Sequence, residues 1–132
     1  FVFAEKLRFD LEPPKPHYLA VAKDLAPRAS ELGDVSVADP LGTGEAAVIT
    51  RYYLDRPGKE WLSGIETPQP QRVAAFLAAV APGEHVLVHS LTPGLAEAMG
   101  QMLDARASYL IRRDADGWTI VGSWPKPADH PY

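Results

Sequence analysis

VSVADPLGTG, residues 35–44, is the stretch that decides the fold class of this 132-residue chain. Its first four residues fit a short buried strand, and the Asp39-Pro40 pair with two glycines beyond it marks a tight turn. Residues 45–54 fit either element, because their β-branched and aromatic residues favour a strand while apolar side chains fall on one helical face. A helix is favoured on topological grounds: a strand, a glycine turn and a helix make the first half of a parallel crossover, which the following segments repeat, and this pattern predicts an α/β domain.

Upstream of this unit, the pattern predicts a strand, a connector and a helix. Residues 1–9 alternate between apolar and polar side chains as a strand does, and the prolines within residues 11–16 predict a stiff connector. The apolar residues from Tyr18 to Leu25 follow helical spacing. Pro27 is expected to end or restart that helix, and Gly33 to stop it.

Downstream, the same reasoning predicts a turn at residues 55–58 and an irregular stretch through residues 61–65. A helix follows, because apolar residues recur at i, i+3, i+4 and i+7 from Val73 to Val80, and Pro82-Gly83 closes it. Residues 86–88 then predict a buried strand.

Thr92-Pro93 predicts the start of the next helix, since a threonine hydroxyl caps helices and proline is tolerated at the first helical position. Its buried stripe is expected to consist of Leu95, Ala98, Met99 and Met102. Residues 109–112 and 118–121 predict two strands joined in a tight hairpin, in which Gly117 can take a positive φ.

Together these elements predict an α/β fold, a layered αβα-like domain with a mixed, partly parallel sheet and a C-terminal β-hairpin. Residues 1–132 are expected to form a single domain, with the first strand and the proline-rich connector in residues 1–16 and an extended tail in residues 125–132. A content of 46% hydrophobic and 23% charged residues is typical of globular domains.

Composition excludes several classes of function. A net charge of -4 argues against nucleic acid and anionic membranes as partners, because both require a basic surface. The absence of cysteine excludes disulfides, thiolate catalysis and cysteine-ligated zinc. No apolar run approaches the ~20 residues that a membrane-spanning helix needs, so a soluble piece is expected, and Phe1 in place of methionine favours a piece of a larger protein.

The candidate ligand-binding residues lie at the ends of two predicted strands. Because the carboxyl ends of adjacent parallel strands open on the same edge of a sheet, the two loops are expected to line one cleft for a small ligand, with free N–H groups at a helix start. The structural alternative is that these side chains only cap turns or helices and hydrogen-bond locally. The candidates are Asp39, Gly42, Gly44, His89, Ser90 and Thr92.

Three further patterns have a functional and a structural interpretation. Residues 42–47 match the dinucleotide pattern G-x-G-x-x-A, but Glu45 would bring negative charge toward a pyrophosphate, and a tight turn before a helix explains the glycines as well. His85 and His89 share one side of a strand but are too far apart to bind one metal ion unaided, so no metal and no cofactor is predicted. The aromatic residues fit a sugar- or lipid-facing surface, or else the cover of the core: Tyr52, Tyr53, Trp61, Trp118 and Trp124.

A family resemblance rests on residues 35–44, on Arg51-Tyr52-Tyr53-Leu54, and on residues 108–113 with Gly117-Trp118 and Ser123-Trp124-Pro125. Over residues 17–127 the chain resembles the C-terminal soluble domain of bacterial integral-membrane glycosyltransferases of the GT-C type, which use polyprenyl-phosphate sugars. In that family the acidic catalytic residues lie on a loop near the first membrane helices, outside this chain. The resemblance therefore implies no catalytic residue here.

By the same resemblance, the domain would lie on the extracytoplasmic, periplasmic face, tethered to an upstream membrane-spanning region of the same polypeptide. It would assist acceptor recognition, with a glycan or lipid-linked sugar as partner, or organise the active site. Two alternatives remain open. One is a free-standing cytoplasmic α/β protein that binds a small ligand at the Asp39 and His89 loops, and the other is an interaction module that uses the hairpin edge and the proline-rich tail.

Overall fold

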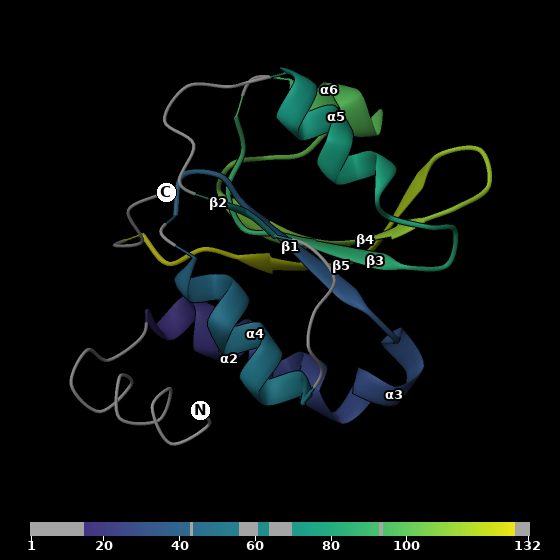
Figure 1. Ribbon diagram of the computed structural model, residues 1–132. Coiled ribbons are helices and arrows are strands. Elements are labelled where there is room, and N and C mark those ends of the chain that lie inside the picture. The colour runs from purple at the N-terminus through teal and green to yellow at the C-terminus, as the bar shows by residue number, and fades with distance from the viewer. Residues whose placement is uncertain (1–14, 43, 56–60, 64–69, 93, 129–132) are drawn as a thin grey trace.

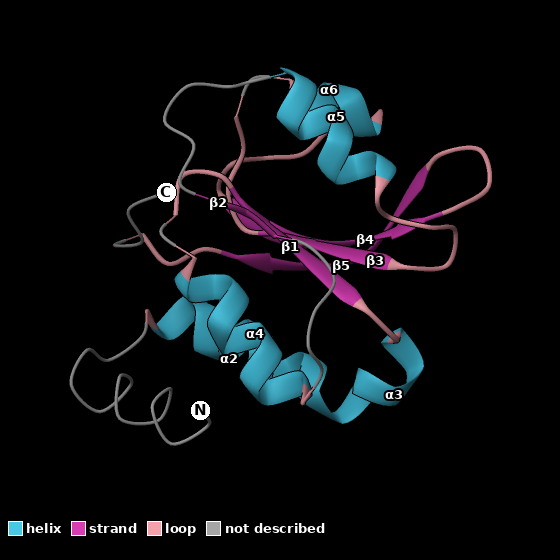
Figure 2. Ribbon diagram, viewed as in Figure 1, coloured by secondary structure: helices cyan, strands magenta, loops and turns pink. Residues whose placement is uncertain are grey.

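The computed structural model describes residues 15–42, 44–55, 61–63, 70–92 and 94–128. Within these residues, one sheet lies between two layers of helices (Figures 1 and 2). Its five strands are β1 (Val35–Asp39), β2 (Trp61–Ser63), β3 (His85–Val88), β4 (Ala107–Arg113) and β5 (Trp118–Pro125). The helices are α2 (Pro16–Leu25), α3 (Ala29–Leu32), α4 (Glu45–Leu54), α5 (Pro70–Ala78) and α6 (Leu95–Met99), with a 3₁₀ turn at Ala26–Arg28 between α2 and α3.

The strand order is β2-β1-β3-β4-β5. Strand β1 runs parallel to both β2 and β3, whereas β4 is antiparallel to β3 and β5 is antiparallel to β4. The predicted fold class is therefore confirmed: the sheet is mixed and partly parallel, and a C-terminal β-hairpin forms its edge.

The two crossover helices lie on opposite faces of the sheet. Helix α4 leads from β1 to β2 on the face that also carries α2, and α5 leads from β2 back to β3 on the other face (Figure 1). The loop after β1 leads to α4 on one face and the loop after β3 leads to α6 on the other, so the two loops leave neighbouring strands in opposite directions (Figure 1). In open α/β sheets, this switch point at the carboxyl ends of the strands is where ligands bind.

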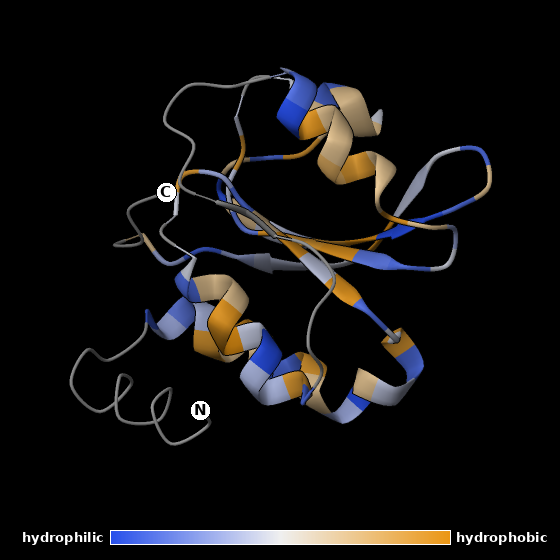
Figure 3. Ribbon diagram, viewed as in Figure 1, coloured by the Kyte–Doolittle hydropathy of each residue, from blue (hydrophilic) through white to orange (hydrophobic). Residues whose placement is uncertain are grey.

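Alternating side chains along the strands build a core on each face. Figure 3 shows the hydrophobic residues concentrated in the central strands, while hydrophobic and hydrophilic residues interchange along α2 and α4. The face under α2, α3 and α4 packs Val21, Leu25, Leu32, Val35, Leu54, Leu87 and Leu110. The face under α5 and α6 packs Val73, Phe76, Val80, Val86, Val88, Leu95, Met99 and Ile111.

Most predicted elements are confirmed. Residues 45–54 form a helix, the chain continues as a 3₁₀ turn around Pro27, and Gly33 ends α3 with φ +67°. The hairpin between β4 and β5 forms, but Gly117 does not take the positive φ expected of it. Residues 1–14 and 129–132 lie outside the described residues, which leaves the first predicted strand and the tail end untested. Pro16 belongs to α2 and Pro125 to β5, so the connector and the tail are shorter than predicted.

The prediction of an irregular stretch at residues 61–65 is wrong for its first part. Trp61–Ser63 forms β2, paired parallel to β1 through Val37, Ala38 and Asp39. A strand of three residues is too short to show an alternating pattern, and here pairing with β1 fixes its conformation.

The predicted start and stripe of the fourth helix are also wrong. Helix α6 begins at Leu95 after Gly94, whose φ is +94°, and no side chain caps it. It ends at Gly100, so Met102 lies beyond the helix and is 96% exposed, and Ala98 is exposed as well. Only Leu95 and Met99 of the expected stripe are buried.

Thr92 has the sequence signature of a helix cap, but its side chain does not cap α6. Its hydroxyl is buried and has no hydrogen-bond partner among the described residues. Replacing it with valine removes a buried, unpaired hydroxyl at nearly constant volume, so Thr92→Val is expected to stabilise the fold by about 1 kcal/mol. Urea denaturation measures this change, and a loss of stability of that size would show that the hydroxyl is bonded after all.

Candidate functional site

The loops after β1 and β3 meet through a buried carboxylate, as the parallel pairing of these strands predicts. Asp39 Oδ1 accepts a hydrogen bond of 2.6 Å from the Ser90 hydroxyl, and Asp39 Oδ2 accepts one of 2.7 Å from the Tyr18 hydroxyl of α2. Ser90 Oγ in turn accepts the Leu41 N–H at 3.1 Å. Asp39, Ser90 and Tyr18 are all buried, so both carboxylate oxygens are occupied inside the fold.

Gly42 is required by this carboxylate rather than by a bound phosphate. A Cβ atom on Gly42 would lie 2.1 Å from Asp39 Oδ2, which is far inside van der Waals contact, and the Gly42 N–H donates to the Asp39 carbonyl at 2.9 Å. Gly44 stands before α4 with φ +93°. In a dinucleotide fingerprint the glycine leaves room for the ligand, whereas here the protein's own carboxylate fills that room.

A second buried group lies beside the first. The Ser108 hydroxyl on β4 is 2.8 Å from His17 Nε2 and 2.8 Å from His89 Nδ1, and Ser108 is fully buried. The His89 ring also packs on Tyr18 with 4.7 Å between ring centroids, and on His17 with 5.8 Å. We call His17, Ser108 and His89 the Ser108 bridge, and we call this bridge together with Tyr18, Asp39 and Ser90 the polar cluster.

The first turn of α2 holds the polar cluster together. The Lys15 N–H donates to Glu45 Oε1 of α4 at 3.0 Å, His17 reaches β4, and Tyr18 reaches β1. Adjacent positions on a helix point about 100° apart, so consecutive residues contact different elements. The start of α2 is thereby joined to three neighbouring elements.

His17, Tyr18 and Ser108 were not predicted as site residues. Tyr18 fits the apolar stripe of its helix, and nothing in the sequence separates its hydroxyl from an ordinary core tyrosine. Ser108 lies two residues before Leu110, and Leu110 shares its core with Leu87, which lies two residues before His89. Side chains two apart on a strand share a face, so this spacing is the signal that places Ser108 and His89 together.

His89 and Ser90 are adjacent in the chain, but their side chains contact different partners. Ser90 donates to Asp39, which accepts a second bond from Tyr18, and His89 contacts Ser108. A serine nucleophile needs a base within hydrogen-bond reach and a space beside it for substrate. Ser108 has histidines in reach, but it is fully buried between them. The polar cluster therefore has the hydrogen bonding of a structural network.

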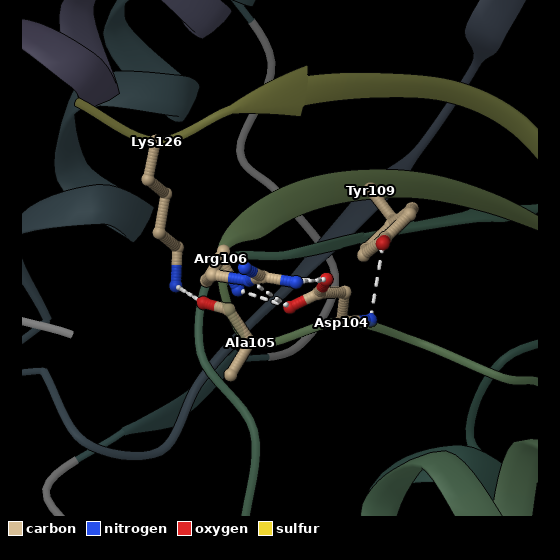
Figure 4. Close-up of polar contacts among 5 residues, drawn as sticks. All are labelled: Asp104, Ala105, Arg106, Tyr109 and Lys126. Carbon is tan, nitrogen blue, oxygen red and sulfur yellow. Dashed lines mark hydrogen bonds and ion pairs between the residues drawn. The ribbon is translucent and has the colours of Figure 1, made fainter. Parts of the chain in front are cut away.

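A corner of polar contacts lies at the start of β4 (Figure 4). Arg106 contacts the Asp104 carboxylate at 2.9 Å, the Asp104 N–H donates to the Tyr109 hydroxyl, and Lys126 Nζ donates to the Ala105 carbonyl at 2.8 Å. The bond from Arg106 lowers the pKa of Asp104. Burial lowers the pKa of Lys126, while the carboxylates of Asp39 and Asp104 act to raise it, which places this cation in the field of the polar cluster.

The two histidines of β3 and its following loop contact different partners. His85 Nδ1 donates to the Leu32 carbonyl at 3.0 Å, since a carbonyl only accepts, whereas His89 contacts Ser108. Across the described ranges there is no group of three or more His, Asp or Glu side chains arranged to hold a metal ion.

His85 predicts a pH dependence of stability. Burial lowers its pKa from the ordinary value of 6.5, and Arg112 and Arg28 lower it further, against the bond to Leu32. The unfolded chain therefore binds a proton near pH 6.5 that the folded chain binds only at lower pH, so stability falls as pH drops from about 7.5 toward 5. Urea denaturation at these pH values should show a smaller loss in His85→Gln than in the parent sequence. Equal losses would exclude His85 as the cause.

The aromatic residues act mainly as cover for the core. Tyr53, Trp118 and Trp124 pack against the buried clusters, and Trp124 Nε1 donates to Asp24 at 2.9 Å. Tyr52 meets Tyr53 edge to face at 5.3 Å between centroids. The side chain of Trp61 lies outside the described residues. This arrangement favours the structural interpretation of these residues.

The fold and the polar cluster define a layered α/β domain in which the Asp39 carboxylate at the switch point accepts hydrogen bonds from Ser90 and Tyr18. Comparison of the chain with protein-family models, with curated proteins and with solved structures gives no match. No helix in the described part of the chain has both the length and the apolar character needed to cross a membrane.

Tyr18 provides the simplest test of the polar cluster. Tyr18→Phe removes one donor from a buried carboxylate and is expected to lower the free energy of unfolding by about 2 kcal/mol. Tyr109→Phe is the matched control, because the Tyr109 hydroxyl takes part in an exposed hydrogen bond to Asp104. Urea denaturation of both variants measures the difference, and equal effects would contradict the assignment.

Proposed function

We propose that this chain is a non-catalytic domain of a membrane glycosyltransferase that uses a polyprenyl-phosphate sugar, and that it assists acceptor recognition or organises the active site. The proposal starts from the resemblance of residues 17–127 to such domains. The observation that supports it most is that the polar cluster forms its hydrogen bonds within the fold. Asp39 uses both carboxylate oxygens inside the fold, and Ser108 is fully buried.

Contacts of Lys15 and Lys126 lie beside the polar cluster. Lys15 bonds to Glu45 at the start of α4, and Lys126 follows the end of β5 and bonds to Arg106 and Ala105 before β4. Both contacts lie at the sheet edge where β1 and β3 end and where the polar cluster lies.

This proposal places the domain on the extracytoplasmic, periplasmic face, with the upstream membrane-spanning region of the same polypeptide as its first partner. A glycan or a lipid-linked sugar would be the second partner. The domain would act by holding loops or by contacting the acceptor, because the polar cluster has no reactive group that is both exposed and activated.

Two measurements test the proposal. The reading frame that encodes the chain should contain, upstream of Phe1, several apolar stretches of ~20 residues, and a start codon directly before Phe1 would overturn the proposal.

The second measurement is a sugar-transfer assay. The purified chain, incubated with a polyprenyl-phosphate hexose and candidate glycan acceptors, should transfer no sugar. The full-length enzyme should transfer sugar, and removal of residues 15–128 should reduce that transfer while the membrane part remains inserted. Transfer by the isolated chain would contradict the non-catalytic role.

A second candidate function is the binding of a small ligand by a free-standing α/β protein. The observation that favours it is the position of Asp39, His89, Ser90 and Thr92 at the switch point, the usual ligand position in open α/β sheets. Titration of the ¹⁵N-labelled chain with nucleotides and sugar phosphates distinguishes the two functions. Shifts that saturate and are confined to the loops after β1 and β3 favour ligand binding, and unchanged spectra favour the glycosyltransferase domain.

A further inference from the structure

The Ser108 bridge places two histidine rings on one buried hydroxyl, and this arrangement has a consequence that does not depend on the proposed function. We propose that the bridge is a pH-dependent latch: it holds the first turn of α2 against the sheet while at least one ring is neutral, and it releases that turn when both rings are protonated. The latch joins α2 through His17, β4 through Ser108 and the loop after β3 through His89.

The number of protons in the Ser108 bridge determines whether its hydrogen bonds can form. A serine hydroxyl has one proton, so it donates to one of the two facing nitrogens, and the other nitrogen must carry a proton and donate to Ser108 Oγ. If both rings were imidazolium, both facing nitrogens would donate. The Ser108 proton would then lose its ring acceptor at a fully buried position, where an unpaired polar group is costly.

Repulsion between the two rings also opposes the doubly protonated state. Titratable groups of the described residues lie around the cluster: Lys15 before α2, Tyr18 on α2, Asp39 on β1, Glu45 on α4, and Lys126 after β5, where the carboxylates of Asp39 and Asp104 act on it. The ring centroids of His17 and His89 are only 5.8 Å apart, so two imidazolium charges would repel each other in a buried setting.

Release of the latch would change the hydrogen bonds in the loops at the switch point. Tyr18 follows His17 directly and donates to Asp39, which also accepts from Ser90, and Ser90 accepts the Leu41 N–H. Movement of the first turn of α2 would therefore break the bond that positions the Asp39 carboxylate. The unfolded or released chain binds two protons at this bridge where the latched chain binds at most one, so acid pH favours release.

Amide hydrogen exchange on the whole chain tests the latch, in a His85→Gln background that removes the other buried histidine. After correction for intrinsic rates, the amides of residues 19–22 should exchange about tenfold faster at pH 5 than at pH 7.5, while those of β3 and β4 change little. In parallel, ¹⁵N shifts of the imidazoles at pH 7.5 should show one protonated and one bare nitrogen facing Ser108.

Two variants locate the effect. Ser108→Ala removes the shared hydroxyl, so residues 19–22 should exchange rapidly at both pH values. His17→Gln keeps a polar group on α2 but cannot be protonated, so it should abolish the pH response even if Ser108→Ala folds poorly. Equal exchange of residues 19–22 at both pH values in the His85→Gln chain would overturn the latch, and so would a pH response that persists in His17→Gln.

Discussion

Replacing Gly42 with alanine is expected to lower the free energy of unfolding by about 3 kcal/mol, because the new Cβ atom has no room. It would lie 2.1 Å from Asp39 Oδ2 and 2.6 Å from the carboxylate carbon. The carboxylate cannot move aside without breaking its bonds to Tyr18 and Ser90. Chemical denaturation followed by circular dichroism measures the loss.

Gly117→Ala is the matched control for this prediction. Gly117 does not have a positive φ, and a Cβ atom there meets no heavy atom within 4 Å, so the same substitution should change stability by less than about 0.5 kcal/mol. In an Asp39→Gly background the penalty at Gly42 should largely disappear, because the clashing group is gone. A Gly42→Ala variant as stable as Gly117→Ala would contradict the position of the carboxylate.

Met99 and Met102 give the second large prediction, since they carry the same side chain in opposite environments. Met99 is 2% exposed in the core under α6, whereas Met102 is 96% exposed beyond the helix end at Gly100. Met99→Ala is expected to cost about 3 kcal/mol through lost burial and a cavity. Met102→Ala should leave stability unchanged within about 0.5 kcal/mol.

Thermal and urea unfolding of the two methionine variants decide between the helix that the sequence predicts and the helix that the structure shows. A continuous stripe through Met102 would make both substitutions costly. Similar losses for Met99→Ala and Met102→Ala would therefore show that α6 continues past Gly100.

The strand and turn at residues 35–44 could be predicted from short-range chemistry, and the helix at residues 45–54 from the parallel crossover that they begin. Hydrophobic residues fill β1, glycines allow the turn, and α4 places its apolar residues on one face. The same is true of the C-terminal hairpin, where two alternating segments flank a short polar turn. In each case the local preference and the tertiary environment agree.

The elements that sequence reasoning missed depend on contacts distant in the chain. Strand β2 is three residues long and exists through its pairing with β1. The Thr92-Pro93 cap sequence predicts a helix that starts at Pro93, but Gly94 adopts φ +94° and α6 starts at Leu95. The cap sequence was present, and the hydroxyl was buried without capping.

The proximity of Asp39 and Ser90 could be predicted, because both follow adjacent parallel strands, and they share a 2.6 Å hydrogen bond. Two other contacts in the polar cluster could not. Tyr18 lies 21 residues before its partner Asp39, and Ser108 lies 19 residues after its partner His89. Such pairings depend on how helices pack on the sheet, which no local pattern determines.

The claim on which the account depends is that the Asp39 carboxylate is held by the protein itself. A double-mutant cycle of Tyr18→Phe and Asp39→Ala, measured by urea denaturation at pH 7.5, tests this most directly. The account predicts a coupling of about 2 kcal/mol between the two substitutions, because each removes one end of the same buried hydrogen bond. Additive effects, with a coupling near zero, would contradict it and leave the carboxylate free to bind a ligand.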